Sequence, residues 1–124
     1  MFELRLSDLA EMGRDDAEAA IRARSQAVAL GDGRILARVL GRNKMFLLAN
    51  DHGFAAHVML DGFWESWITL FFARNVRPGM TVIDVGANFG YYTCVFADAV
   101  GASGRVIAIE PAPVTARLLR DTVL

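Results

Sequence analysis

The sequence predicts an α/β fold in which two parallel strands follow an N-terminal helix and a small antiparallel β-meander. Three observations support this prediction. The run Thr81–Val85 is apolar and β-branched, which favours a buried strand. A glycine-bounded turn then leads into Tyr91–Val100, whose apolar residues recur at helical spacing. A second apolar run, Val106–Glu110, ends at an acid. Strand, turn, helix and strand in this order indicate a βαβ unit, whose two strands are parallel.

The first sixty residues predict a helix and then three short strands. Asp15 or Asp16 can cap a helix that runs through Leu30 and ends at Gly31. After it, apolar runs alternate with turns rich in Gly, Asn and Asp, which is typical of an antiparallel meander. The predicted strands are residues 34–40, 44–49 and 55–60.

An aromatic helix is predicted over Phe63–Asn75, just before the first parallel strand. Its apolar stripe most simply packs against the sheet, although Trp64 or Trp67 could also stack on a substrate. Glu65 lies near the start of this helix, where an acid either suits the helix dipole or contacts a cofactor or substrate. The residues of the stripe are Phe63, Trp67, Leu70 and Phe71.

The two helices of the second half carry their own signals. In Tyr91–Val100 the apolar stripe faces the sheet, Tyr91 lies off the stripe near the helix start, and Gly101 ends the helix. Pro111 and Pro113 favour a fresh helix start, with Leu118, Leu119 and Val123 on one face.

Composition excludes several classes of protein. A chain of 124 residues has room for one modest domain, and 54% hydrophobic against 22% charged residues indicates a packed core. The net charge of −1 without a basic cluster argues against nucleic acid as a partner. The longest uncharged stretch, residues 85–97, is too short to span a membrane. Cys94 is the single cysteine, so we expect a reducing, cytoplasmic location and a buried, inert thiol. No metal site is predicted.

The position of the acid predicts a nucleoside site. In open α/β sheets, ligands bind at the carboxyl ends of the parallel strands, and an acid about 20 residues after the glycine turn contacts the ribose hydroxyls. Glu110 lies 20 residues after Gly90. Gly86 and Gly90 could instead serve only a tight turn, and Asp84 could only cap the next helix. The combination of two strands, a turn, a helix and two placed acids favours the site.

The turn itself favours S-adenosylmethionine over a dinucleotide. The dinucleotide pattern G-x-G-x-x-G would place its second and third glycines at Asn88 and Tyr91, so a pyrophosphate would meet side chains there. S-adenosylmethionine has no phosphate. Asp84 can attract its ammonium, and the N–H groups of the turn and of the following helix can bind its carboxylate.

At these residues the chain resembles the FkbM-type S-adenosylmethionine-dependent methyltransferases. The resemblance covers roughly Phe63 to Leu124 and rests on the string Asp-Val-Gly-Ala-Asn-Phe-Gly-Tyr-Tyr, followed by Gly-Arg-Val and Glu-Pro. Ala112 departs from the family, which often has Asn after Glu-Pro. The resemblance implies an incomplete Rossmann-like methyltransferase fold. It assigns cofactor roles to five positions, and Ala87 and Tyr91 complete the predicted set of Asp84, Gly86, Ala87, Asn88, Gly90, Tyr91 and Glu110.

The family resemblance also implies an activity. Its members mostly methylate hydroxyl groups, so we expect O-methyl transfer to a small molecule or glycan, with no nucleic-acid or membrane partner. No residue is predicted as the catalytic base. Because the fold needs further strands, we expect a truncated module, with residues 1–62 as a cap and 63–124 as the cofactor domain. A homodimer or a complementing chain at the exposed edge of the Thr81–Val85 strand is expected. A non-catalytic remnant that acts through another chain is the alternative.

Overall fold

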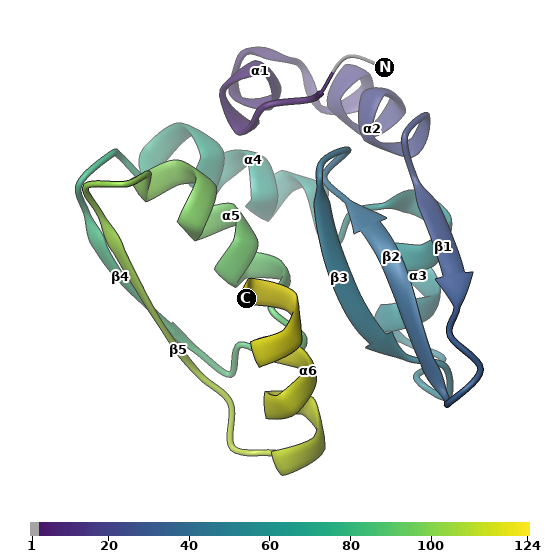
Figure 1. Ribbon diagram of the computed structural model, residues 1–124. Helices are drawn as coiled ribbons and strands as arrows, with labels where there is room; N and C mark the ends of the chain where they lie inside the picture. The colour runs from purple at the N-terminus through teal and green to yellow at the C-terminus, as the bar shows by residue number, and fades with distance from the viewer. Residues whose placement is uncertain (1–2) are drawn as a thin grey trace.

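Two separate sheets organise the chain, which the computed structural model describes over residues 3–124 (Figure 1). The fold is α/β, as predicted. Its helices and strands, in chain order, are α1 (Leu6–Glu11), α2 (Arg14–Arg22), β1 (Gln26–Ala29), β2 (Arg34–Val39), β3 (Asn43–Leu48), α3 (Phe54–Asp61), α4 (Ser66–Asn75), β4 (Thr81–Val85), α5 (Tyr91–Val100), β5 (Arg105–Ile109) and α6 (Pro113–Val123).

The second sheet confirms the predicted pair of parallel strands. β4 and β5 pair in parallel from Thr81 opposite Arg105 to Val85 opposite Ile109. The helix between them, α5, has the predicted bounds and packs against both strands. Because α5 returns the chain to the start of the sheet, both strands end at the same edge, where the turn after β4 and Glu110 after β5 come together.

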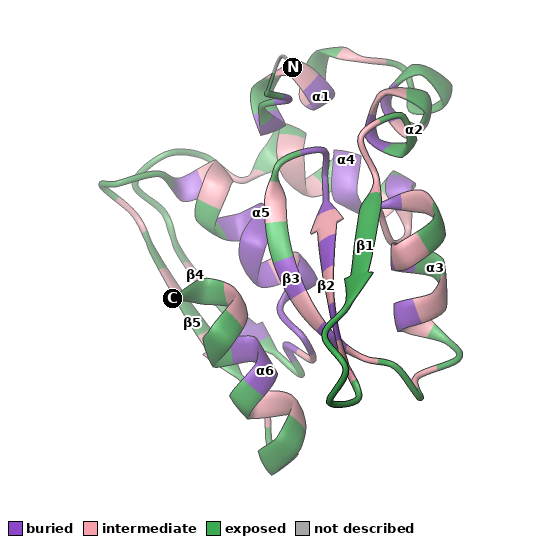
Figure 2. Cartoon of the chain, turned by 45° about the vertical axis from the view of Figure 1, so that its right-hand side comes forward, coloured by how far each residue is buried: buried purple, intermediate pink, exposed green. Residues whose placement is uncertain are grey.

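The first sheet is antiparallel, in the order β1-β2-β3. Alternate side chains of β2 and β3 are buried, so one face of this sheet belongs to the core. One hydrophobic cluster runs from this face through α1, α2 and α3 to α4, α5 and α6 (Figure 2). The division into a cap at residues 1–62 and a cofactor domain at 63–124 therefore stays a prediction.

Two predictions for the N-terminal half were wrong. The helix that was expected to reach Leu30 ends at Arg22, and Gln26–Ala29 instead forms β1, whose side chains are all exposed. An exposed strand has no apolar alternation, and pairing with β2 overrides the helix preference of its alanines. Residues 55–60 form helix α3 rather than a strand. A short apolar run fits either structure, and here it buries Ala55 and Val58, one helical turn apart.

The buried faces of α4 and α5 also differ from the prediction. α4 buries Ser66, Thr69 and Leu70, whereas Trp67 and Phe71 of the predicted stripe are more than half exposed. On α5, Tyr91 was expected to lie off the buried stripe, but it is only 2% exposed. The reason is that α4 packs across α5, so a second face of α5 is buried in addition to the face on the sheet.

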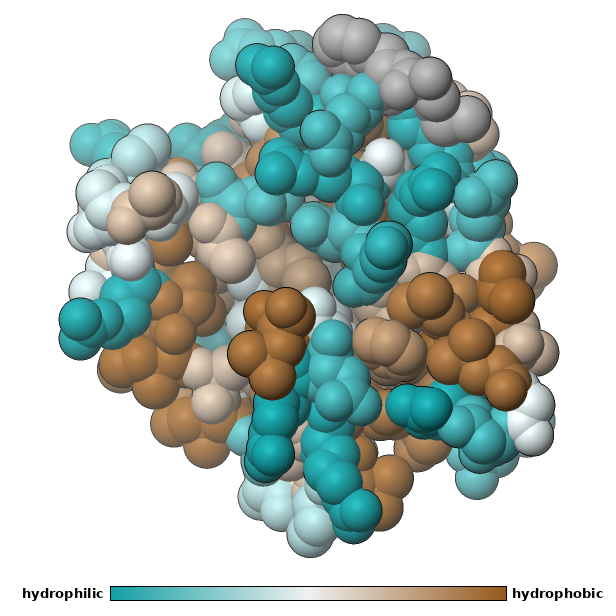
Figure 3. Space-filling view, viewed as in Figure 1, coloured by the Kyte–Doolittle hydropathy of each residue, from teal (hydrophilic) through white to brown (hydrophobic). Residues whose placement is uncertain are grey.

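The outer face of the β4–β5 sheet is apolar and open to solvent. Among the described residues, no further strand pairs with β4, and no helix covers the side chains on this face. Apolar side chains gather over β4 and β5 at the left of Figure 3. The exposed side chains on the outer face are Ile83, Val85, Ile107 and Ile109.

Candidate functional site

The turn between β4 and α5 is fixed to the end of β5 by backbone hydrogen bonds. The N–H groups of Gly86 and Ala87 both donate to the carbonyl of Ile109, at 2.9 and 3.0 Å. Gly86, Asn88 and Gly90 all have positive φ, at +76°, +53° and +100°. Glycine adopts this region without cost, and asparagine does so more readily than other side chains. The turn therefore needs these residue types, whatever it binds.

Glu110 is held between the turn and the segment after β5. Its Oε2 accepts a hydrogen bond from the N–H of Asn88 at 2.8 Å, and its Oε1 accepts one from the N–H of Ala112 at 2.9 Å. Each carboxylate oxygen keeps a further lone pair, and the side chain is partly exposed. Glu110 is thus a pre-oriented acceptor for two hydroxyl groups at the carboxyl ends of the parallel strands.

Asp84 lies deeper than Glu110, behind the start of α5. Its residue is 9% exposed, and its Oδ2 accepts a hydrogen bond of 2.6 Å from the hydroxyl of Thr93. No sequence pattern singles out Thr93 as this partner. Asp84 therefore links the end of β4 to α5, and its access to a ligand is restricted.

Two tyrosine hydroxyls connect the start of α5 to the start of α4. Tyr91 Oη and Thr69 Oγ1 are 2.9 Å apart, and burial raises the pKa of Tyr91 to about 12. Tyr92 Oη donates to Glu65 Oε2 at 2.8 Å. Burial, and after it Glu65, raises the pKa of Tyr92, so the phenol stays protonated and donates. The side chain of Tyr91 thus points into the core rather than along the turn.

Only some of the predicted site residues lie together in the structure. Asn88 and Glu110 are in direct contact, with Gly86 and Ala87 beside them on the end of β5. Asp84 and the side chain of Tyr91 are turned inward. The expected role of the turn N–H groups is reduced, because those of Gly86, Ala87, Asn88 and Gly90 all donate within the protein. The N–H groups of Tyr91, Tyr92 and Thr93 open α5 and by helix geometry have no partner inside the helix.

The turn is open at Gly86 but closely packed at Gly90, where an added Cβ would lie 2.7 Å from Leu119 Cδ1. A side chain built on Gly86 would meet nothing within 4 Å, so the turn has open space on that side. Glu110 supplies the acceptor that a diol needs. No group of acidic, histidine or cysteine side chains in residues 3–124 could hold a metal ion. Cys94 is buried, and burial raises the pKa of its thiol to about 12, so it is not a nucleophile at neutral pH.

Comparisons with known proteins point to methyltransferases. Residues 62–122 match the family model of protein-L-isoaspartate(D-aspartate) O-methyltransferase. Protein-L-isoaspartate O-methyltransferase 1 of Arabidopsis thaliana is 48% identical over 40 residues, which are 32% of this chain and 17% of the relative. The Methanopyrus kandleri protein-L-isoaspartate O-methyltransferase is 43% identical over 47 residues, 38% and 21% of the two chains. A ribosomal RNA large subunit methyltransferase E of Hahella chejuensis is 51% identical over 37 residues, 30% and 18% of the two chains.

The search of solved structures found no match. The chain spans about a fifth of the length of the curated relatives that it matches. The matched region contains α4, β4, α5, β5 and most of α6, and so includes every residue of the predicted site. The fold is a partial Rossmann-like methyltransferase fold, and S-adenosylmethionine is the methyl donor that the comparisons support.

Two expectations change with these findings. The expected small-molecule or glycan acceptor was wrong, because the matched family and two of the three relatives described above are named for isoaspartate in proteins. The methyltransferase class is supported, but the FkbM type specifically is not. Within residues 3–124, no helix has the length and apolar character needed to cross a membrane.

Proposed function

We propose that residues 62–124 bind S-adenosylmethionine and form the donor-binding part of a methyltransferase of the protein-L-isoaspartate type. The acceptor class that we propose is a carboxyl group of a protein. The observation that carries the proposal is the Glu110 carboxylate, held by the N–H groups of Asn88 and Ala112 beside an open glycine turn. The match of residues 62–122 to the family model supports the same ligand. The FkbM type stays a prediction from the motif alone.

Each part of the site has a separate task. Bound S-adenosylmethionine supplies an electrophilic methyl group on its sulfonium. Glu110 accepts hydrogen bonds from the two ribose hydroxyls, and the turn at Gly86 leaves space for the nucleoside. The N-terminus of α5 offers N–H groups to the carboxylate of the methionine part. These residues bind and orient the donor, and orientation supplies much of the rate in a transfer between two bound groups.

The first prediction concerns Glu110. Replacing Glu110→Ala removes the charged acceptor of two hydroxyls, so we expect the binding free energy of S-adenosylhomocysteine to weaken by about 1.5–3 kcal/mol, roughly ten- to a hundredfold in Kd. Isothermal titration calorimetry measures this change. Asp121→Asn is the matched control, because Asp121 is an exposed acid of α6 that lies 3.8 Å from Arg34. An affinity that Glu110→Ala leaves unchanged would show that Glu110 only joins the turn to β5.

A further inference from the structure

A cavity of about 320 Å³ lies beside the start of α4. Its walls include the indole rings of Trp64 and Trp67 and the charged side chains of Arg14, Asp61 and Glu65. This volume lies within the usual range of small-molecule sites. The guanidinium of Arg14 already lies over Trp67, so the groups on this wall that can attract a ligand cation are the two carboxylates and the ring of Trp64.

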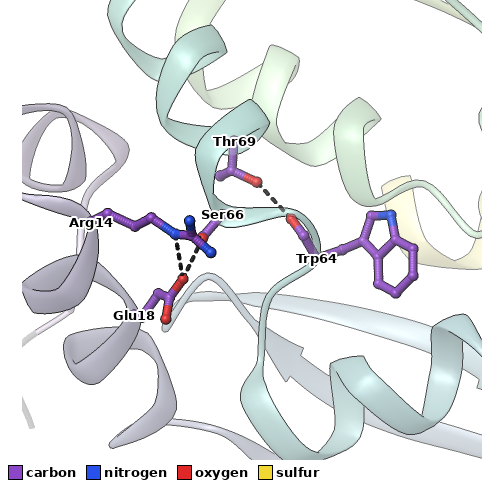
Figure 4. A network of polar contacts seen from close by, with 5 residues as sticks. All are labelled: Arg14, Glu18, Trp64, Ser66 and Thr69. Carbon is purple, nitrogen blue, oxygen red and sulfur yellow. Dashed lines mark hydrogen bonds and ion pairs between the residues drawn. The ribbon is translucent and has the colours of Figure 1, made fainter.

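Most of the charges on this wall already have partners. Asp61 forms an ion pair of 2.9 Å with Arg22. Arg14 pairs with Glu18 at 2.9 Å, donates to the hydroxyl of Ser66, and stacks over Trp67 with its guanidinium 5.1 Å from the ring centroid. In Figure 4 the contacts of Arg14 with Glu18 and Ser66 lie on one side of the start of α4, and the ring of Trp64 points away from them. Neither Arg14 nor Asp61 is therefore left to bind a further charge.

Glu65 is the charged residue of this wall that has no ion-pair partner among residues 3–124. It is half-buried, its Oε2 accepts the phenol of Tyr92, and no Lys, Arg or His of residues 3–124 lies within ion-pair distance of it. A half-buried carboxylate without a cation has lost part of its hydration, so a bound cation would restore favourable interactions. The neutral phenol gives it one hydrogen bond but no charge.

The position of Glu65 connects the cavity to the cofactor turn. Tyr92 follows Gly90 by two residues, so the bond from its phenol places Glu65 beside the start of α5. Trp64, next to Glu65 in the chain, is also tied to α5. Its carbonyl accepts a hydrogen bond from the hydroxyl of Thr69, which also bonds the hydroxyl of Tyr91. The ring of Trp64 also lies 5.2 Å from that of Phe54, which lies 5.9 Å from Phe89 in the turn.

We propose that Glu65 binds the α-ammonium group of S-adenosylmethionine, with the methionine part of the donor in this cavity. The inference rests on the proposed function. It assigns to Glu65 the role that the sequence suggested for Asp84, which is 9% exposed and already bonded to Thr93. Asp84 then acts by holding α5 on β4, and Glu65 faces the charged end of the ligand.

A pair of ligands isolates the ammonium. S-adenosylhomocysteine and its desamino analogue differ only in that group. Titrating each ligand into the unchanged chain and into the Glu65→Gln variant gives four affinities, which form a double-mutant-type cycle. We expect Glu65→Gln to weaken the binding of S-adenosylhomocysteine by about tenfold or more, and to change the affinity for the desamino analogue by no more than about twofold. Asp121→Asn, an exposed acid of α6 outside this cavity, should leave the ratio of the two affinities unchanged.

The outcomes separate the two levels of the proposal. Equal losses for both ligands, or no loss for either, would overturn the role of Glu65 while leaving the donor site intact. A chain that binds neither ligand before substitution would overturn the proposed function and this inference with it. The desamino analogue also reports on folding, because a misfolded variant would lose that ligand as well.

Discussion

At the residue scale, the site depends on close approaches of the backbone. Gly104 shows this most clearly, because an added Cβ would lie 2.3 Å from Val100 Cβ and 2.7 Å from the Met80 carbonyl oxygen. The absence of a side chain lets the end of α5 and the segments that lead into β4 and β5 meet there. Gly104 thus helps to set the height of α5 over the sheet, and with it the position of the turn.

We therefore expect Gly104→Ala to destabilise the fold by about 2–4 kcal/mol, because backbone must move to admit one methyl group. Gly13→Ala is the control. Gly13 has an ordinary negative φ, and a Cβ there would meet nothing within 4 Å. Only the weaker preference for Ala at the N-cap of α2 remains, so the cost should stay at about 0.5–1 kcal/mol. Urea unfolding followed by circular dichroism measures both. Equal stability of the two variants would contradict the close packing at Gly104.

At the element scale, sequence patterns predicted the helices and strands whose formation depends on local interactions. The bounds of β4 and α5 followed from a β-branched run, a glycine turn and a clear helical period, and the place of Glu110 at the end of β5 followed from the order of the elements. α3 and β1 were not predictable, because a short apolar run and an exposed strand carry no distinguishing period. The pairing of Tyr92 with Glu65, 27 residues apart, depends on how α4 crosses α5, which no local pattern encodes.

The outer and the buried side of the β4–α5 unit can be compared by making the same substitution, Val→Thr, on each side. Val85 is 76% exposed on the outer face of β4, and Val95 of α5 is fully buried. Val→Thr keeps the shape and adds a hydroxyl, which costs free energy only where water is excluded. We expect Val85→Thr to change the free energy of unfolding by less than about 0.5 kcal/mol and Val95→Thr to lower it by about 1–3 kcal/mol. Similar losses at both positions in a urea titration would mean that the outer face is covered.

At the scale of the whole molecule, one hydrophobic cluster ties the antiparallel sheet to the parallel pair. The turn and the start of α4 are held by elements that belong to this cluster, so the proposed donor site rests on the packed core. Parallel sheets are usually covered on both faces, yet the face with Ile83 and Val85 is exposed here. The proposed donor site lies at the ends of the strands and does not use that outer face.

The central claim is that this site binds S-adenosylmethionine rather than a dinucleotide. Titration of S-adenosylhomocysteine and of NAD into the 124-residue chain, followed by calorimetry under identical conditions, tests it most directly. We expect saturable binding of S-adenosylhomocysteine, because Glu110 meets its ribose and no pyrophosphate has to pass Asn88, and at least about tenfold weaker binding of NAD. Binding of NAD that equals or exceeds that of S-adenosylhomocysteine would contradict the claim.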